Sequence, residues 1–114
     1  MSKIICCLFA ALVFAIPISG QSQHKLLRKG DRQFDLEHYQ ESEKYYRDAA
    51  DRRFGDPRTL YNLGSSLYQQ GKWEEAATRF EQSSRLATDK GLKADAFHNL
   101  GNTQLKQQKY KDAI

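Results

Sequence analysis

Large and small apolar side chains recur at fixed distances between residues 26 and 114, and this recurrence predicts pairs of amphipathic helices. A shift of 34 residues superimposes side chains of similar size: Leu26 and Leu60, Gly30 and Gly64, Tyr39 and Trp73, Tyr46 and Phe80. A further shift of 37 continues the series: Leu60 and Phe97, Leu63 and Leu100, Gly64 and Gly101, Trp73 and Tyr110, Ala76 and Ala113. Within each copy the apolar positions follow the helical period twice. The pattern therefore predicts three copies of a helical hairpin.

The middle copy has the clearest helix boundaries. Its first helix is predicted from Pro57 to Gln70, because proline suits the first helical turn and Asp56 before it is a good N-cap. Gly71 follows, where a left-handed C-cap forms most easily. The second helix is predicted to start near Trp73.

The small residues predict close helix packing, since helices approach to about 8–10 Å only where contact side chains allow it. We expect Gly64 to face Ala76 at the closest approach, with Ser83 leaving room for the next copy. The large side chains expected to fill the space around this contact are Leu60, Leu63, Leu67, Trp73 and Phe80.

The segment "LYNLGSSL" from Leu60 to Leu67, followed by Ala76 and Phe80, resembles the tetratricopeptide repeat. The resemblance implies an all-α solenoid of about three repeats at residues 21–56, 57–90 and 91–114. The proline that ends the family's repeat is missing, with Phe54 and Thr88 in its places. A second helix of the third copy would begin at "KYKDAI", so we expect this copy to be truncated and the chain to be part of a longer protein.

Residues 1–20 have the composition of a signal peptide. Lys3 precedes an apolar run from Ile4 to Ile16, which is short for a membrane span, and small residues follow. Such a leader would direct export, and its cleavage after Gly20 would remove both cysteines; an uncleaved leader would instead be a membrane anchor. We expect a periplasmic protein, or one associated with the inner membrane on its periplasmic side.

Charge and candidate chemistry argue against other function classes. The 18 Lys and Arg residues are interleaved with 14 Asp and Glu, which is typical of a solvated helix surface rather than a nucleic-acid site. His24, His38 and His98 lack the spacing of a zinc site. No nucleophile motif or phosphate loop is apparent, so we expect no enzyme activity, metal or cofactor.

By the resemblance, the first helices of the repeats line a concave groove that binds proteins or peptide segments. The groove residues implied are Leu27, Asp31, Phe34, Tyr61, Asn62, Ser65, Tyr68, Gln69, His98, Asn99, Asn102 and Lys106. Packing between neighbouring repeats is the alternative for Tyr68, whereas Tyr61 is expected to be exposed.

The segments "YNLGSSLYQQGKWEEAATRFEQSS" and "KADAFHNLGNTQLKQQKYKDAI" are similar to exported tetratricopeptide proteins of the Bacteroides aerotolerance (Bat) group. This narrower resemblance implies a cell-envelope scaffold beside von Willebrand factor A-domain membrane proteins and an AAA-type ATPase. The alternatives are a self-assembling structural element and the repeat part of a longer exported enzyme.

Overall fold

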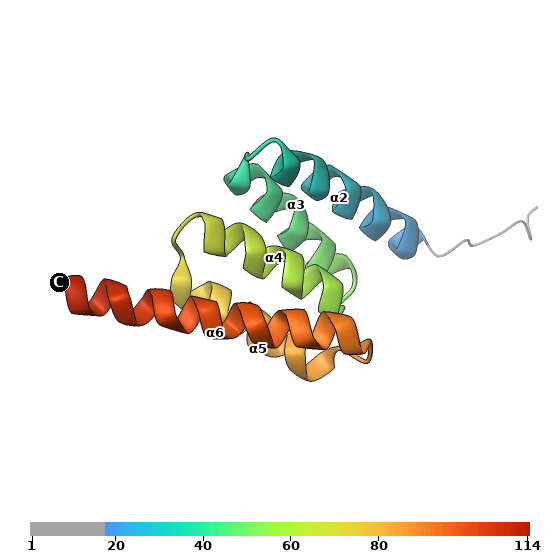
Figure 1. Cartoon of the computed structure of the whole chain (residues 1–114). Helices are drawn as coiled ribbons and strands as arrows, with labels where there is room; N and C mark the ends of the chain where they lie inside the picture. The colour runs from blue at the N-terminus through green and yellow to red at the C-terminus, as the bar shows by residue number, and fades with distance from the viewer. Residues whose placement is uncertain (1–17) are drawn as a thin grey trace, which may run out of the picture.

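The computed structural model describes the backbone of residues 18–114 and the side chains from residue 22 onward. This part of the chain consists of helices joined by short turns, which confirms the all-α prediction for it. The helices, numbered as in Figure 1, are α2 (Ile18–Asp35), α3 (Tyr39–Arg52), α4 (Pro57–Gln69), α5 (Trp73–Leu86) and α6 (Lys90–Ala113). Of the predicted leader, residues 1–17 lie outside the described residues, and residues 18–20 form the first turn of α2.

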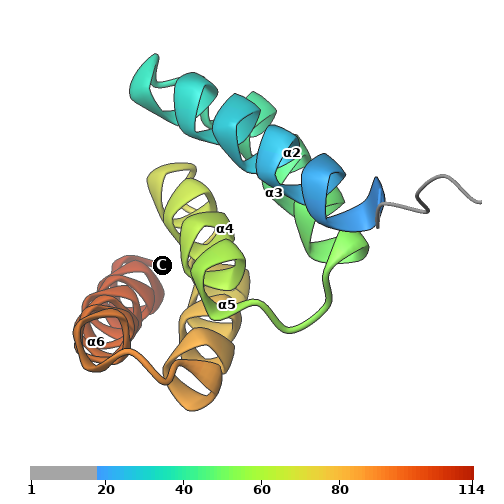
Figure 2. The same ribbon diagram turned by 90° about the vertical axis from the view of Figure 1, so that its right-hand side faces the viewer.

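The helices form two hairpins and one further helix. In Figure 1, α2 and α3 run antiparallel as one pair, and α4 and α5 as the next. Each helix packs mainly on its neighbours in sequence, while α6 lies against α5 and also touches α4. Figure 2 shows α2, α4 and α6 following one another from the upper right to the lower left. The tandem helix-turn-helix packing agrees with the predicted solenoid.

Both hairpins turn through the same backbone motif. In the second hairpin, the N–H of Lys72 bonds to the carbonyl of Leu67, and Gly71 between them has a φ of 76°. In the first hairpin, the N–H of His38 bonds to the carbonyl of Gln33 in the same way. These are Schellman caps, which need a left-handed residue after the helix. The sequence placed this residue correctly at Gly71.

In the first hairpin the left-handed position is taken by Glu37, with a φ of 61°. A shift of 34 residues pairs Glu37 with Gly71. A side chain in this conformation costs about 1–2 kcal/mol, because its β-carbon approaches the following carbonyl. The packing of α3 on α2 must offset this strain.

The predicted start of α4 is confirmed. Asp56 is the N-cap, and its carboxylate accepts a hydrogen bond of 3.1 Å from the N–H of Arg58. Pro57 occupies the first turn. The same carboxylate accepts hydrogen bonds from the hydroxyl of Thr59 and from the side-chain amide of Gln23 on α2, so the cap also joins the two hairpins.

Gly64 was predicted to face Ala76, and the atoms nearest to it belong to the ring of Phe80. A β-carbon added to Gly64 would lie 2.9 Å from Cε1 of Phe80, so the glycine makes room for an aromatic ring. The first hairpin repeats this contact, with Tyr46 against Gly30. Ala76 is fully buried in the same core. The sizes of the side chains alone do not show which residue of α5 covers Gly64, because this depends on how the two helices are rotated about their axes.

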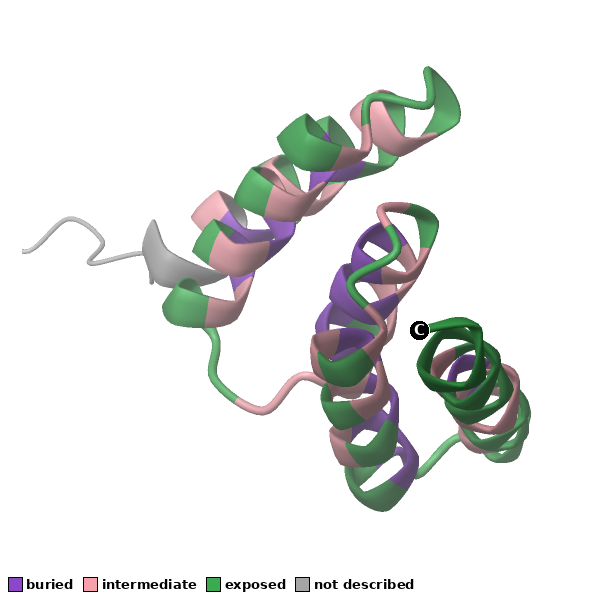
Figure 3. Ribbon diagram, turned by 90° about the vertical axis from the view of Figure 1, so that its left-hand side faces the viewer, coloured by how far each residue is buried: buried purple, intermediate pink, exposed green. Residues whose placement is uncertain are grey.

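The buried core is formed mainly by the second hairpin, with Tyr46 of the first hairpin against it. Leu60, Leu63, Leu67 and Phe80 are buried as predicted, whereas Trp73 is half-buried. Ser83 is also buried, but its hydroxyl donates a hydrogen bond of 2.8 Å to the carbonyl of Pro57. Figure 3 shows that the buried residues concentrate on α3, α4 and α5, whereas α6 is largely exposed.

The third copy departs from the predicted hairpin. Instead of a turn before "KYKDAI", α6 continues as one helix through Ala113. The position that corresponds to Gly71 is Gln108, and "LKQQKYKDA" has neither glycine nor proline to interrupt a helix. Beyond its chain neighbours and the backbone of its own helix, a β-carbon added to Gly101 would meet nothing within 4 Å among the described residues, so no other described helix packs against it. The three extra residues before this copy are absorbed by an earlier helix start at Lys90.

A polar network fixes the first hairpin against the second. One carboxylate oxygen of Glu43 on α3 accepts hydrogen bonds from Gln70 and from Lys72, each of 2.9 Å. The other oxygen accepts a bond of 2.8 Å from Arg47, whose guanidinium also contacts Glu75 on α5. Burial alone would raise the pKa of Glu43, but these donors outweigh it and lower the pKa to about 2. The network therefore stabilises the relative position of the hairpins while Glu43 is ionised.

Among the helices of the described chain, none has the length and apolarity needed to cross a membrane.

Candidate functional site

A hollow of about 500 Å³ lies between α2 and α4. It brings together five of the predicted groove residues: Asp31, Phe34, Tyr61, Asn62 and Ser65. The first two come from the last turns of α2, and the other three from the middle of α4. Asp35 and Tyr46 complete the lining. The hollow therefore combines aromatic surface with polar groups of several kinds.

Tyr46 is a lining residue that the sequence analysis paired with Phe80 and did not include in the groove. It is 2% exposed, yet its hydroxyl donates a hydrogen bond of 2.6 Å to the carboxylate of Asp31. Burial, with the nearby carboxylates of Asp31 and Asp35, raises the pKa of Tyr46 well above its ordinary value. The corresponding residue of the second hairpin is Phe80, which has no hydroxyl. The hydroxyl of Tyr46 was therefore the one sequence signal that this position has a polar role.

A second, smaller hollow of about 170 Å³ adjoins the first between α4 and α6. The two share Phe34 and Ser65, so they form one groove. Phe34 packs edge to face on Tyr39 with the ring centroids 5.2 Å apart, which holds its side chain between the hollows. The remaining residues of the second hollow are Tyr68, Gln69, Phe80, Asn99 and Asn102. Phe80 was predicted only as a core residue.

Tyr61 links α4 to α6, which corrects the expectation that it is exposed. Its ring is half-buried and packs edge to face on Phe80 with the centroids 5.6 Å apart. Its hydroxyl accepts a hydrogen bond of 2.7 Å from the side-chain amide of Asn99. Burial and the charge of Asp95 raise the pKa of Tyr61. Tyr61 therefore helps to fix the spacing of the two helices that form the second hollow.

Tyr68 takes the packing role that was left open for it. It is half-buried against the core and packs edge to face on Trp73 with the centroids 5.0 Å apart. Its edge still lines the second hollow, so one ring serves both packing and groove.

Three predicted groove residues line neither hollow. Leu27 is half-buried and packs against the core. His98 is exposed on α6. Lys106 is also exposed, with its ammonium nitrogen 6.0 Å from the ring centroid of Trp73.

The groove offers recognition chemistry. Amide groups of Asn62, Gln69 and Asn102 can donate to and accept from a peptide backbone. Aromatic edges supply rigid contact area at low entropic cost. In the described part of the chain, no group of three or more His, Cys, Asp and Glu side chains is placed to hold a metal ion.

Comparison with protein families agrees with this geometry. The model of a family described as tetratricopeptide repeat matches residues 55–114, which cover α4, α5 and α6 and make up more than half of the 114 residues. No curated protein matches the chain.

Proposed function

The chain belongs to the tetratricopeptide repeat family, whose repeats generally mediate protein–protein interactions, and from this premise we propose that it is a non-catalytic scaffold. Segments of partner proteins bind in the groove formed by α2, α4 and α6. The observation that carries the proposal is the continuity of the two hollows through Phe34 and Ser65, which makes the groove longer than a single helix pair.

The lining suits an extended segment. The amides of Asn62 and Asn102 lie in successive hollows, where each can pair with the backbone of a bound chain. The edges of Phe34 and Tyr68 offer apolar contact between them. Most of the lining is neutral, so side-chain fit and backbone pairing carry specificity.

Site-specific photocrosslinking tests the proposal. A photoreactive amino acid at Asn62 or Asn102 should capture a discrete partner, because both positions line the groove. The matched control is Glu81, which is exposed on α5 and lines neither hollow. Equal capture from Glu81 would mean that the groove has no specific ligand.

The narrower proposal is an exported, Bat-type envelope protein that works beside von Willebrand factor A-domain membrane proteins and an AAA-type ATPase. It is supported by the leader-like composition of residues 1–20 and by the sequence similarity of the second and third copies. Fusing residues 1–20 to a reporter that is active only after export tests the location. An inactive reporter in the cytoplasmic fraction would contradict it.

A second candidate function, self-assembly by helix stacking, is favoured by one observation. Phe97, Leu105 and Tyr110 on α6 are each more than half exposed. Light scattering over a concentration series separates the two candidates, because a scaffold stays monomeric without its partner whereas a self-assembling element grows with concentration.

A further inference from the structure

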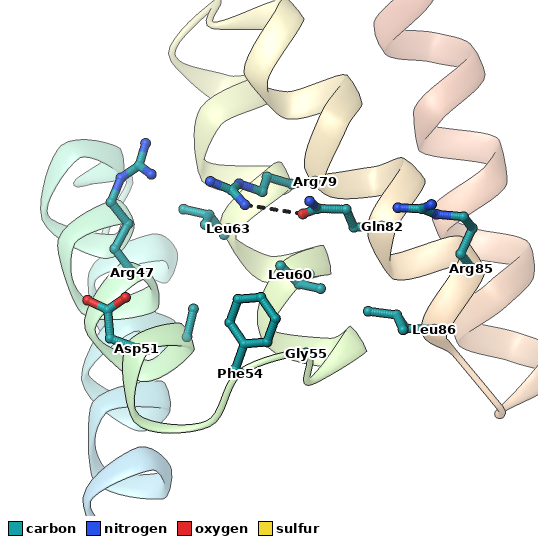
Figure 4. A pocket seen from close by; sticks show the side chains of 11 residues that line it. Arg47, Asp51, Phe54, Gly55, Leu60, Leu63, Arg79, Gln82, Arg85 and Leu86 are labelled. Carbon is teal, nitrogen blue, oxygen red and sulfur yellow. Dashed lines mark hydrogen bonds between the residues drawn. The ribbon is translucent and has the colours of Figure 1, made fainter.

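A cavity of about 600 Å³ lies between α3, α5 and the start of α4, and it shares no residue with the groove. Its apolar part is formed by the buried Leu60 and Leu63, with Ala50 beside them. Phe54 and Leu86 stand at its edge and are 99% and 48% exposed. Figure 4 shows these two side chains on one side of the cavity and guanidinium groups along the other. The cavity is therefore amphipathic.

The arginines of the cavity differ in how their charge is balanced. Arg47 is neutralised by the carboxylates of Glu43 and Glu75, at 2.8 and 2.6 Å. Arg79 donates only to the neutral side chain of Gln82, and its buried Nε has no hydrogen-bond partner among the described residues. Within the same part of the chain, Arg85 forms no ion pair. Asp51, on α3, is the one carboxylate in the lining, so positive charge prevails along α5.

Phe54 is not explained by the fold. It stands in the turn between the hairpins, where the family has a proline, and the next residue, Gly55, has a φ of 80°. A ring that is 99% exposed contributes almost nothing to packing. An aromatic ring beside an apolar cavity with two unbalanced arginines is the composition of a binding hot spot.

We propose that this cavity is a second docking site, for a segment of a partner protein in which acidic residues flank a large apolar side chain. The apolar side chain enters between Phe54 and Leu60, and the carboxylates pair with Arg79 and Arg85. Arginine suits this role because its guanidinium binds a carboxylate through two parallel hydrogen bonds. The proposal goes beyond the groove, whose lining is mostly neutral.

Selection from a random library of displayed twelve-residue peptides on the full chain tests the proposal without assuming a sequence. Enriched peptides should combine aspartate or glutamate with leucine or an aromatic residue. Their affinity, measured by fluorescence anisotropy, should fall about tenfold or more in Phe54→Ser and in Arg85→Glu, and should weaken as salt rises. Both positions are exposed, so these variants should keep the fold.

Two controls separate this site from the groove. Arg28→Glu makes the same charge change on an exposed position of α2 and should alter the affinity less than twofold. Asn102→Ala changes the groove and should leave these peptides bound. If Asn102→Ala abolishes binding while Arg85→Glu does not, the peptides occupy the groove, and the second site is refuted without harm to the proposed function.

Three other outcomes would also overturn the proposal. The first is that the selection enriches no peptides that combine acidic and large apolar residues. Sedimentation can show a dimer that dissociates in Phe54→Ser, which would assign the cavity to a second copy of the chain. Finally, Phe54→Ser can lower the melting temperature by several degrees, which would mean that the ring fills the cavity in solution.

Discussion

Replacing Gly64 and Gly101 by alanine, one at a time, tests whether the recurring glycine exists for the aromatic ring of its partner helix. The two glycines occupy equivalent positions in successive copies and are both within helices. Only Gly64 has a ring against it: an added β-carbon would lie 2.9 Å from Cε1 and 3.0 Å from Cδ1 of Phe80. At Gly101 the same β-carbon would meet no described atom within 4 Å.

The magnitudes follow from two opposing effects. Alanine is favoured over glycine in a helix interior by about 1 kcal/mol. Overpacking a filled core costs about 1–3 kcal/mol, and Phe80 has little freedom to move because it is 1% exposed and packs on Tyr61. Gly101→Ala should therefore stabilise the chain by up to about 1 kcal/mol. Gly64→Ala should be less stable than Gly101→Ala by about 1–3 kcal/mol, because the helix-propensity gain is common to both.

Thermal unfolding followed by far-ultraviolet circular dichroism measures this difference. For a domain of this size, 1 kcal/mol corresponds to about 4–8 °C in melting temperature. We therefore expect the two variants to differ by at least about 4 °C, with Gly64→Ala the lower.

A second substitution identifies the ring as the cause. Phe80→Leu removes Cε1, so Gly64→Ala should cost less in the Phe80→Leu background than alone. Equal melting temperatures for the two alanine variants, or an unchanged cost in that background, would refute the role assigned to the ring.

Three further predictions concern the polar and backbone features. The pKa of Glu43 is lowered from 4.5 to about 2, so the ionised carboxylate stabilises the folded chain by about 1–2 kcal/mol after allowance for its partly exposed partners. This stabilisation is present above pH 4.5 and is lost as the pH falls toward 2. Urea unfolding should show the loss in the wild type and not in Glu43→Gln. Glu37→Gly should raise the free energy of unfolding by about 1 kcal/mol and Gly71→Ala should lower it by about as much, because both positions have positive φ; changes of the same sign would contradict this. Tyr61→Phe should cost about 1 kcal/mol in urea unfolding, since it leaves the amide of Asn99 without its partner; an unchanged unfolding midpoint would mean that the hydrogen bond does not form in solution.

The boundaries of α4 and the hairpin turn after it could be predicted from sequence because local chemistry sets them. Asp56, Pro57 and Gly71 each satisfy a requirement of a helix end that involves only a few neighbouring residues. The partner of Gly64 could not be predicted in the same way. It depends on the rotation of α5 against α4, which the sizes of the side chains alone do not fix.

The structure brings nine of the predicted groove residues together in the two hollows and leaves three outside them. Phe34 and Ser65, which the family resemblance projected onto the inner face, lie where the two hollows meet. Leu27 packs against the core instead of lining either hollow. The family resemblance assigns a position along the helix, but not the direction in which the side chain at that position packs. Tyr46 was not predicted to line the groove, because the pattern of apolar positions records only its ring, which fills the core. Its hydroxyl, at the end of the same side chain, reaches Asp31 in the groove.

The third copy shows why the repeat pattern alone does not make a hairpin. In the first copy the left-handed turn position is occupied by Glu37, which adopts this backbone conformation at a cost, whereas glycine would adopt it freely. The turn therefore forms even without a residue that favours it. What offsets the strain is the contact that the turn makes possible, with Tyr46 against Gly30. The corresponding turn residue of the third copy is Gln108, and no described side chain covers Gly101. Within the described residues, the same turn at Gln108 would cost about 1–2 kcal/mol with no contact to offset it, and α6 is helical through Ala113.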